Sequence, residues 1–245
     1  MRHLIRGLKT FQTEVFPRHR ELFERLYRNQ EPECLFITCA DSRVVPNLIL
    51  QADPGELFVL RNAGNIVPPP GTGAGATLSG IEYALDVLGV KNIVLCGHSN
   101  CGAMKGILEP GLVAHLPSVA HWLRFGAAAA ADVERMGAGL DDAAKLELLV
   151  ERNVIRQVKH LLAHDSVRRG IEAGRLQIYG WVYDILTGAV KGLDDAGESF
   201  HEIRFDAMGS PDERKMLLEL EAPGADPGGA GAGGASPAPT DSSAP

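Results

Sequence analysis

The sequence predicts an α/β fold in which helices flank a mainly parallel central sheet of four to five strands. The first observation is a set of four short apolar runs, each with the length and content of a buried strand. These runs are CLFIT at 34–38, ELFVLR at 56–61, NIVLCG at 92–97 and LQIYGWV at 176–182. The second observation is that helical patterns separate the runs, because strands that alternate with helices form parallel sheets. The weaker run FHEIRF at 200–205 predicts a fifth strand at an edge of the sheet.

A helix is expected between the second and third runs, where apolar residues recur along 76–88 with helical spacing and Gly89 follows as a stop signal. A helix at this place supplies the crossover that two parallel strands require. Three further helices are expected between the third and fourth runs, beginning at Pro117, at Asp141 and near Asp165.

Two extended helices are expected at the N-terminus, before the first strand. The first has an apolar stripe at helical spacing, formed by Leu4, Leu8, Phe11 and Val15. One compact domain has little need for such a stripe, although it could simply pack on the chain's own sheet. The second helix is expected to begin at Pro17 and to bury Leu22, Phe23 and Leu26.

The 245 residues are expected to form a single domain over residues 1–222, followed by a disordered tail. Residues 223–245 are almost entirely Gly, Ala, Pro, Ser and Asp. They contain no large apolar side chain that could offset the entropy of ordering them. The run MLLELEA at 216–222 is short and is not assigned to an element.

Charge and composition narrow the class of partner. A net charge of -7 argues against a nucleic-acid partner, because phosphate binding requires a basic surface. No apolar run approaches the ~18 residues of a membrane-spanning helix, and the segment MRHLIRGLKT lacks the apolar region of a secretory signal. We therefore expect a cytoplasmic protein that acts on small solutes or binds other proteins, without a membrane or nucleic-acid partner.

The cysteines provide the strongest chemical signal. Four are too few for a disulfide framework, and in a reducing compartment cysteines bind metal or pack as small hydrophobic residues. Cys34 and Cys96 lie inside predicted strands and are assigned to the core. Cys39 follows the first strand in the motif CADSR, and His98 and Cys101 follow the third in HSNCG, where ligands gather in open α/β sheets. Two thiolates and one imidazole suit zinc and leave a fourth position open for catalysis.

Such a zinc ion predicts chemistry on a small electrophile, because zinc lowers the pKa of its bound water to about 7. A zinc-bound hydroxide is then available near neutral pH, and carbon dioxide is its simplest substrate. Asp41 could accept the hydrogen bond of the hydroxide and leave an oxygen lone pair aimed at the substrate. Arg43 would hold Asp41 through paired hydrogen bonds and keep the carboxylate from binding the metal in a closed state.

Each part of this pattern also has a simpler interpretation. A His-x-x-Cys pair occurs by chance, and an isolated cysteine is usually a buried hydrophobic residue. Asp41 and Arg43 alone would form a surface pair that adds little stability. Ligands at two strand ends, with an acid and an arginine beside the first, favour a metal site over these separate interpretations.

Three segments resemble the β-carbonic anhydrases in order and spacing. They are CADSRV at 39–44, RNAGN at 61–65 and GHSNCGAMKG at 97–106, and the resemblance extends over about residues 10–205. It implies zinc as the cofactor, bound by Cys39, His98 and Cys101, with Asp41 and Arg43 as the catalytic dyad. It also implies the reversible hydration of carbon dioxide to bicarbonate and a proton, which is the lyase activity of a carbonic anhydrase.

The resemblance further implies a substrate pocket shared between two subunits. Gln30, Phe58 and Tyr83 stand at the positions of its side chains, and the backbone amide of Gly102 stands at that of a further donor. Without the resemblance, Gln30 is a loop residue and the two aromatic residues belong to the core. In the family the N-terminal helices reach over a partner, so a homodimer or a dimer-based higher oligomer is expected.

Some members of this family close the site when the aspartate binds zinc. Bicarbonate stabilises that state in a pocket formed by a tryptophan, an arginine and a tyrosine. This chain has Arg61 and Tyr183 at two of these positions but Phe36 at the third, and phenylalanine lacks the indole N–H donor. A constitutively open site is therefore expected.

Three other functions stay open on the sequence. Relatives with this fold hydrolyse carbon disulfide or carbonyl sulfide with the same zinc ligands, and access to the metal decides between the substrates. A noncatalytic zinc module or bicarbonate sensor would be expected if the dyad had decayed, but Asp41 and Arg43 are intact. Thiol redox chemistry ranks last, because Cys39 and Cys101 are not in a C-x-x-C arrangement. The other seven histidines have no partner pattern that identifies a proton shuttle.

Overall fold

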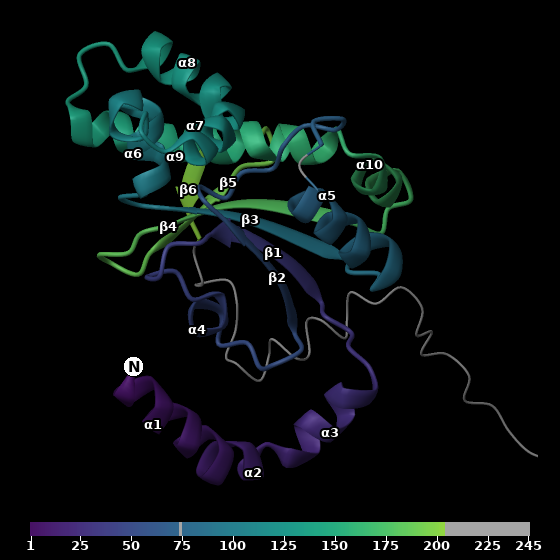
Figure 1. Ribbon diagram of the computed structural model, residues 1–245. Coiled ribbons are helices and arrows are strands. Elements are labelled where there is room, and N and C mark those ends of the chain that lie inside the picture. Colours follow the sequence, from purple (N-terminus) through teal and green to yellow (C-terminus); the bar gives the residue numbers. More distant parts are fainter. Residues whose placement is uncertain (74, 204–245) are drawn as a thin grey trace, which may run out of the picture. The chain divides into compact units, whose positions relative to one another are not determined.

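A six-stranded sheet forms the centre of the computed structural model, which describes residues 1–73 and 75–203 (Figure 1). The strands are β1 (Cys34–Cys39), β2 (Leu57–Asn62), β3 (Asn92–His98), β4 (Gln177–Tyr183), β5 (Val190–Leu193) and β6 (Phe200–Glu202). Their order in the sheet is β2-β1-β3-β4-β5-β6. The first four are parallel, and β5 and β6 are added antiparallel. The expected α/β fold with a mainly parallel sheet is confirmed.

The sheet differs from the expectation by one strand. All four strong apolar runs form strands, and the weak run forms the edge strand β6. The unexpected strand is β5, whose sequence VKGL is too short and too mixed to show the period of a strand. It forms because it pairs antiparallel with the end of β4, with Val182 opposite Lys191. Residues 216–222, the expected domain end at 222 and the expected tail at 223–245 lie outside the described residues.

Helices precede the first strand and connect the parallel strands. They are α1 (Arg2–Thr10), α2 (Phe16–Arg18), α3 (Arg20–Arg28), α4 (Pro46–Leu50), α5 (Gly75–Glu82), α6 (Gly102–Leu108), α7 (Pro117–Leu123), α8 (Ala127–Met136), α9 (Asp142–Leu162) and α10 (Asp165–Glu172). The expected crossover between β2 and β3 is α5, which continues as a π-helical turn over Tyr83–Val87. Three of the five helices between β3 and β4, namely α7, α9 and α10, begin where the sequence predicts them, and α6 and α8 were not expected. Asp141 is the N-cap of α9, and its carboxylate accepts a hydrogen bond from Ala144 N at 2.8 Å.

The two faces of the sheet have separate cores, because side chains alternate along a strand. On one face, Leu35 and Ile37 of β1 pack in a cluster with buried residues of α9 such as Val154. On the other face, Phe36 packs with Val94 and Cys96 in a smaller cluster. Helix α9 lies directly on β3 at Gly97, where a Cβ atom would come within 2.8 Å of Val154. The long helix is therefore anchored immediately beside His98, the last residue of β3.

The N-terminal helices leave their apolar side chains largely exposed. None of the residues of α1, α2 or α3 is buried, and Leu4 and Leu8 are 59% and 57% exposed. The expectation of a second helix that starts at Pro17 and buries three apolar residues is wrong. The longer helix α3 starts at Arg20, and its side chains Leu22, Phe23 and Leu26 are only half-buried. Phe23 stacks on Phe16, with ring centroids 5.2 Å apart, inside the helical segment itself.

Candidate metal centre

Three side chains that are far apart in the sequence converge at one edge of the sheet. Cys39 and His98 are the last residues of the neighbouring parallel strands β1 and β3, and Cys101 is the N-cap of α6. All three are buried, and their ligand atoms lie within 4.8 Å of one another. The two sulfurs are 3.9 Å apart. The spacing and the burial fit a single metal ion bound by two sulfurs and one nitrogen.

The imidazole of His98 is oriented for metal binding. Its Nδ1 lies 2.9 Å from the carbonyl oxygen of Ser99, and because a carbonyl can only accept, Nδ1 carries the hydrogen. The other nitrogen, Nε2, is buried and has no hydrogen-bond partner among the described residues. A buried acceptor without a donor is costly unless another group takes its lone pair. A metal ion beside the two sulfurs would do so.

The two thiols share a hydrogen bond that shifts their pKa values in opposite directions. The pKa of Cys39 is lowered to about 4, against the effect of burial; the hydrogen bond from Cys101 is the largest cause, and the hydrogen bond from Gly64 N to the sulfur at 3.3 Å acts in the same direction. The same thiol–thiol bond, together with burial, raises the pKa of Cys101. The pair therefore releases one proton readily and holds the second. A divalent cation would compensate the second thiolate, which is the behaviour of a zinc site.

The carboxylate of Asp41, which is held by Arg43, lies next to these candidate ligands. Arg43 donates to Asp41 from Nε to Oδ1 at 2.9 Å and from Nη2 to Oδ2 at 2.8 Å, so the two hydrogen bonds expected from the sequence are present. They hold the pKa of Asp41 well below its usual range. Oδ2 of Asp41 lies 3.9 Å from His98 Nε2. An ionised oxygen therefore lies within reach of any group bound to the metal.

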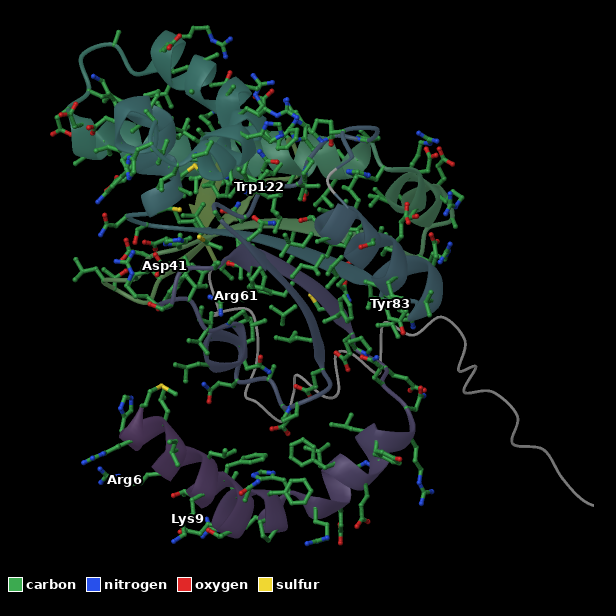
Figure 2. The ribbon with its side chains drawn as sticks, viewed as in Figure 1. Arg6, Lys9, Asp41, Arg61, Tyr83 and Trp122 are labelled. Atoms are coloured by element: carbon green, nitrogen blue, oxygen red, sulfur yellow. The ribbon has the colours of Figure 1, made fainter. Side chains whose placement is uncertain are left out.

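The predicted pocket residues lie together, but away from the metal group of their own chain. Phe58 pairs with Leu35 in the sheet, four residues before Cys39, which corresponds to about 13 Å along a strand. Its ring lies 6.0 Å from that of Tyr83, and Gln30 and Tyr83 line a cavity of about 830 Å³. Figure 2 shows Asp41 and Tyr83 toward opposite ends of the parallel strands. Gly102, in contrast, directly follows Cys101 as the first residue of α6.

Comparison with known proteins identifies the family. The family model for carbonic anhydrase matches residues 34–190, a range that contains the whole metal group. The carbonic anhydrase of Pseudomonas aeruginosa is 48% identical over 200 residues, which cover 82% of this chain and 90% of that protein. The solved β-carbonic anhydrase CcaA has a TM-score of 0.80 at 41% identity, and the match covers 83% of this chain and 99% of that one. The chain belongs to the β-carbonic anhydrase family.

A further solved relative agrees with this assignment. Tetrameric β-carbonic anhydrases from the ascomycete Sordaria macrospora match with a TM-score of 0.70 at 32% identity, over 78% of this chain and 95% of theirs. β-Carbonic anhydrases are zinc enzymes, and the donor set of Cys39, His98 and Cys101 fits zinc. The cofactor expected from the sequence is confirmed. Within the described residues of this carbonic anhydrase, no helix is long and apolar enough to cross a membrane.

Arg61 braces the loop that carries the aspartate. Its Nε donates to the carbonyl oxygen of Cys39 at 3.1 Å, and its Nη2 donates to that of Asp41 at 2.6 Å. Figure 2 shows Arg61 on the same side of the sheet as Asp41. Phe36 and Tyr183 lie on the same face of the sheet as Arg61, because Phe36 pairs with Val59, two residues before Arg61, and Val59 and Tyr183 both pack against the cluster of Phe36. The three residues weighed for a bicarbonate pocket thus share one face of the sheet, with phenylalanine at the position of the expected indole donor.

Sequence reasoning missed two contributors to the metal group. The motif RNAGN was noted, but not that the amide of Gly64 would donate to the sulfur of Cys39. A glycine shortly after a strand end was the available signal, and Gly64 has a positive φ of 80°. Trp122, whose indole contacts the same loop, lies 59 residues from it in the sequence, and no local pattern connects the two.

Proposed function

We propose that this carbonic anhydrase catalyses the reversible hydration of carbon dioxide to bicarbonate and a proton. The proposal is carried by one observation, a buried group of two sulfurs and one imidazole nitrogen beside an ionised carboxylate. Cys39, His98 and Cys101 would hold zinc. Zinc, when bound, lowers the pKa of water to about 7 and so supplies a nucleophile near neutral pH.

Asp41 and Arg43 form the catalytic dyad in this proposal. Asp41, as an ionised acceptor, takes a hydrogen bond from the nucleophile and directs its remaining lone pair at carbon dioxide. Arg43 holds the carboxylate in that position with its two parallel hydrogen bonds. The same guanidinium donates to the carbonyl oxygen of Asn100 at 3.2 Å, in the loop between two of the metal ligands. Arg43 thereby connects the loop after Cys39 with the loop that carries His98 and Cys101.

We further propose that the site is constitutively open. Asp41 would close the site by becoming a metal ligand itself, and Arg43 opposes that movement. A regulatory bicarbonate would require donors near Phe36, which has none. Arg61 already donates to two backbone carbonyl groups, which reduces its capacity to bind an anion. Added bicarbonate should therefore slow hydration only as a product does, with no cooperative inhibition.

The substrate pocket is proposed to be completed by a second copy of the chain. Gln30, Phe58 and Tyr83 lie at the amino-terminal side of the sheet, where they cannot contact the metal group of their own chain. Strand β2, which carries Phe58, is an edge strand, and the N-terminal helices expose an apolar stripe. Both features are typical of a surface that a partner covers. The tetrameric relatives from Sordaria macrospora support a dimer-based assembly.

In such an assembly each pocket residue has a distinct role. The two aromatic side chains of the partner would form apolar walls that exclude bulk water and strengthen the field of the metal on the substrate. Gln30 of the partner copy would bind one oxygen of carbon dioxide, together with the backbone amide of Gly102. The homodimer is thus the smallest assembly with a complete site.

Metal analysis combined with a stopped-flow assay of carbon dioxide hydration tests the function. About one zinc per chain and rapid hydration are expected. Zinc without hydration would refute the enzymatic role and favour a noncatalytic zinc or bicarbonate-binding module. Hydrolysis of carbon disulfide or carbonyl sulfide, assayed in parallel, would favour the alternative substrate if it exceeded hydration.

We also propose a cytoplasmic location. The four cysteines are free in the structure, and a reducing compartment keeps such thiols available for zinc. Cell fractionation with an antibody to the chain tests this, and recovery in a membrane or secreted fraction would contradict it.

A further inference from the structure

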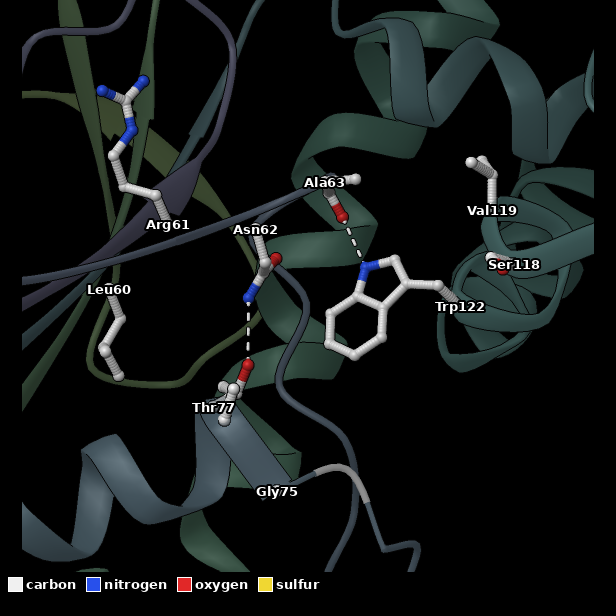
Figure 3. Close-up of a pocket in the computed structure, with 10 residues that line it drawn as sticks. Leu60, Arg61, Asn62, Ala63, Gly75, Thr77, Ser118, Val119 and Trp122 are labelled. Carbon is white, nitrogen blue, oxygen red and sulfur yellow. Dashed lines mark hydrogen bonds between the residues drawn. The ribbon is translucent and has the colours of Figure 1, made fainter. Parts of the chain in front are cut away.

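One peptide group touches the metal ligand Cys39 on one side and helix α7 on the other. The N–H of Gly64 donates to Cys39 Sγ at 3.3 Å. The carbonyl oxygen of Ala63, on the same peptide, accepts a hydrogen bond from Trp122 Nε1 at 2.8 Å (Figure 3). In a trans peptide the N–H and the C=O point in opposite directions. The indole, the peptide and the sulfur therefore form a continuous chain of hydrogen bonds.

The next peptide is held from helix α9. Asn153 is 1% exposed, and its Nδ2 donates to the carbonyl oxygen of Gly64 at 3.0 Å. Gln157 orients Asn153 by donating from Nε2 to Asn153 Oδ1 at 3.1 Å. Its own orientation is determined by the backbone, because Val67 N–H donates to its Oε1 at 2.9 Å and the Phe125 carbonyl accepts from its Nε2 at 3.1 Å. Both amide side chains thus have a single arrangement that satisfies every partner.

Gly64 needs these external contacts because its backbone is intrinsically free. Its φ is +80°, and a Cβ atom would lie 2.9 Å from Met104 Cε and 3.0 Å from Ala103 Cβ. A residue with a side chain would be strained at this position as well as crowded. Glycine satisfies both constraints, but it has no side chain that could fix the direction of its N–H. Trp122 and Asn153 provide that restraint from the two flanking peptides.

We propose that Trp122 and Asn153 are positioning residues that hold the Gly64 amide on the sulfur of Cys39. The indole hydrogen bond polarises the Ala63 carbonyl and makes the N–H of that peptide a stronger donor. An N–H directed at a thiolate withdraws charge from the sulfur and keeps it in its ligating position. This inference rests on the proposed metal site, and it assigns a role to two residues that would contact neither metal nor substrate.

Trp122→Phe tests the first half of the inference, because it removes the indole N–H and retains an aromatic ring that can pack edge-on against Phe125. The matched control is Trp181→Phe, the same substitution in β4, where the ring packs against Phe36 in the other core. Each protein is loaded with cobalt(II) in place of zinc, and the thiolate-to-cobalt charge-transfer band is recorded. Zinc affinity is measured separately by competition with a chromogenic chelator.

The Trp122→Phe band is expected at longer wavelength than that of the wild type, because a thiolate without its donor gives up charge more easily. Zinc affinity should fall roughly tenfold, the lower end of the range for groups outside the ligand set. Trp181→Phe should change neither quantity. An unshifted band with wild-type affinity in Trp122→Phe would overturn the inference, and so would equal shifts in both tryptophan variants.

Asn153→Ala gives an independent test from α9, with Leu161→Ala as its control for loss of a fully buried side chain in the same helix. The asparagine variant should shift the band in the same direction as Trp122→Phe, and the leucine variant should lower stability without moving it. If Asn153→Ala does not fold, Gln157→Met gives the same reading, since it releases Asn153. A wild-type protein without a thiolate-to-cobalt band would refute the metal site itself, and the inference with it.

Discussion

The guanidinium of Arg43 and the carboxylate of Asp41 are joined by two parallel hydrogen bonds of 2.9 and 2.8 Å, and the backbone N–H of Arg43 adds a third at 3.0 Å. The carboxylate therefore has little freedom to rotate toward His98, although its Oδ2 is only 3.9 Å from His98 Nε2. Without Arg43, the same carboxylate could either accept a hydrogen bond beside the metal or bind the metal itself. Asp41 can accept a hydrogen bond beside the metal without becoming a ligand of it.

Replacing Arg43 with Ala should cut carbon dioxide turnover by about 10- to 100-fold while zinc stays bound, because the ligands are intact but Asp41 is free to bind the metal. Arg43→Lys should be intermediate, since lysine keeps the charge but not the planar pair of donors. Stopped-flow hydration and zinc content are measured on the same samples. Arg168→Ala, which removes an exposed ion pair with Asp165, is the control. Normal turnover in Arg43→Ala would show that the dyad is unnecessary.

Cys101→Ser should lose zinc and hydration activity together, because it removes a charged soft donor from a three-ligand site. Cys34→Ser is the matched control, since Cys34 is half-buried at the opposite end of β1 and is not among the candidate ligands. Zinc is measured by atomic absorption after dialysis. A Cys101→Ser protein with wild-type zinc and activity would show that the ligand assignment is wrong.

A shared pocket predicts that two defective chains can repair each other. In a hybrid dimer of Cys101→Ser with the double variant Gln30→Ala/Tyr83→Ala, one site would receive an intact metal group and an intact pocket. Hybrids isolated with two different affinity tags should regain about half of the wild-type activity, because one of two symmetric sites is complete. A hybrid no more active than its two parents would place the pocket residues outside the site.

Glutamates at Leu4 and Leu8 should weaken the dimer, because both side chains belong to the exposed apolar stripe of α1. The variant should bind zinc as a monomer while its hydration rate falls by about 10- to 100-fold, since the pocket would lose its second half. Arg6→Glu/Lys9→Glu is the control, with two glutamates in the same helix outside the stripe (Figure 2). Mass in solution, zinc content and rate are read on one sample. A zinc-loaded monomer with the full rate would contradict the shared site.

The carboxylate of Asp132 should make the free energy of unfolding depend on pH in the acidic range. Its carboxylate is 1% exposed and accepts hydrogen bonds from Arg156 at 2.6 and 2.7 Å, which lower its pKa to about 2. A lowered pKa stabilises the fold above pH 3.8, the ordinary value, and that contribution is lost as the pH falls through about 2. The contribution is about 2 kcal/mol at neutral pH, and about half of it should remain at pH 3.

Urea unfolding of wild type and Asp132→Asn at pH 6 and pH 3 measures this contribution. The difference in the free energy of unfolding between the two proteins should shrink as the pH is lowered. Asp165→Asn, at an exposed ion pair, should show a small difference that does not change in this way. A constant difference for Asp132→Asn would mean that its arginine contacts do not lower the pKa of the carboxyl group.

The sequence by itself determined the parallel strands and the ligands at their ends. Each strong apolar run became a strand, and Cys39 and His98 end two neighbouring strands of the sheet. These features were readable because they depend on local patterns and on one general rule, that ligands gather at the carboxyl ends of parallel strands. The contact between Asp41 and Arg43 was readable for the same reason, since the two residues are only two positions apart.

Only the tertiary structure decided the features that depend on distant pairing. Strand β5 exists because it pairs with β4, and its own four residues carry no strand pattern. The register of β2 placed Phe58 beside Leu35, four residues before Cys39 on β1 and away from the metal group of its own chain. The hydrogen bonds of Trp122 and Asn153 to the loop around Gly64 join residues 59 and 89 positions apart. Such contacts depend on how the helices pack against the sheet, and no local pattern in the chain encodes them.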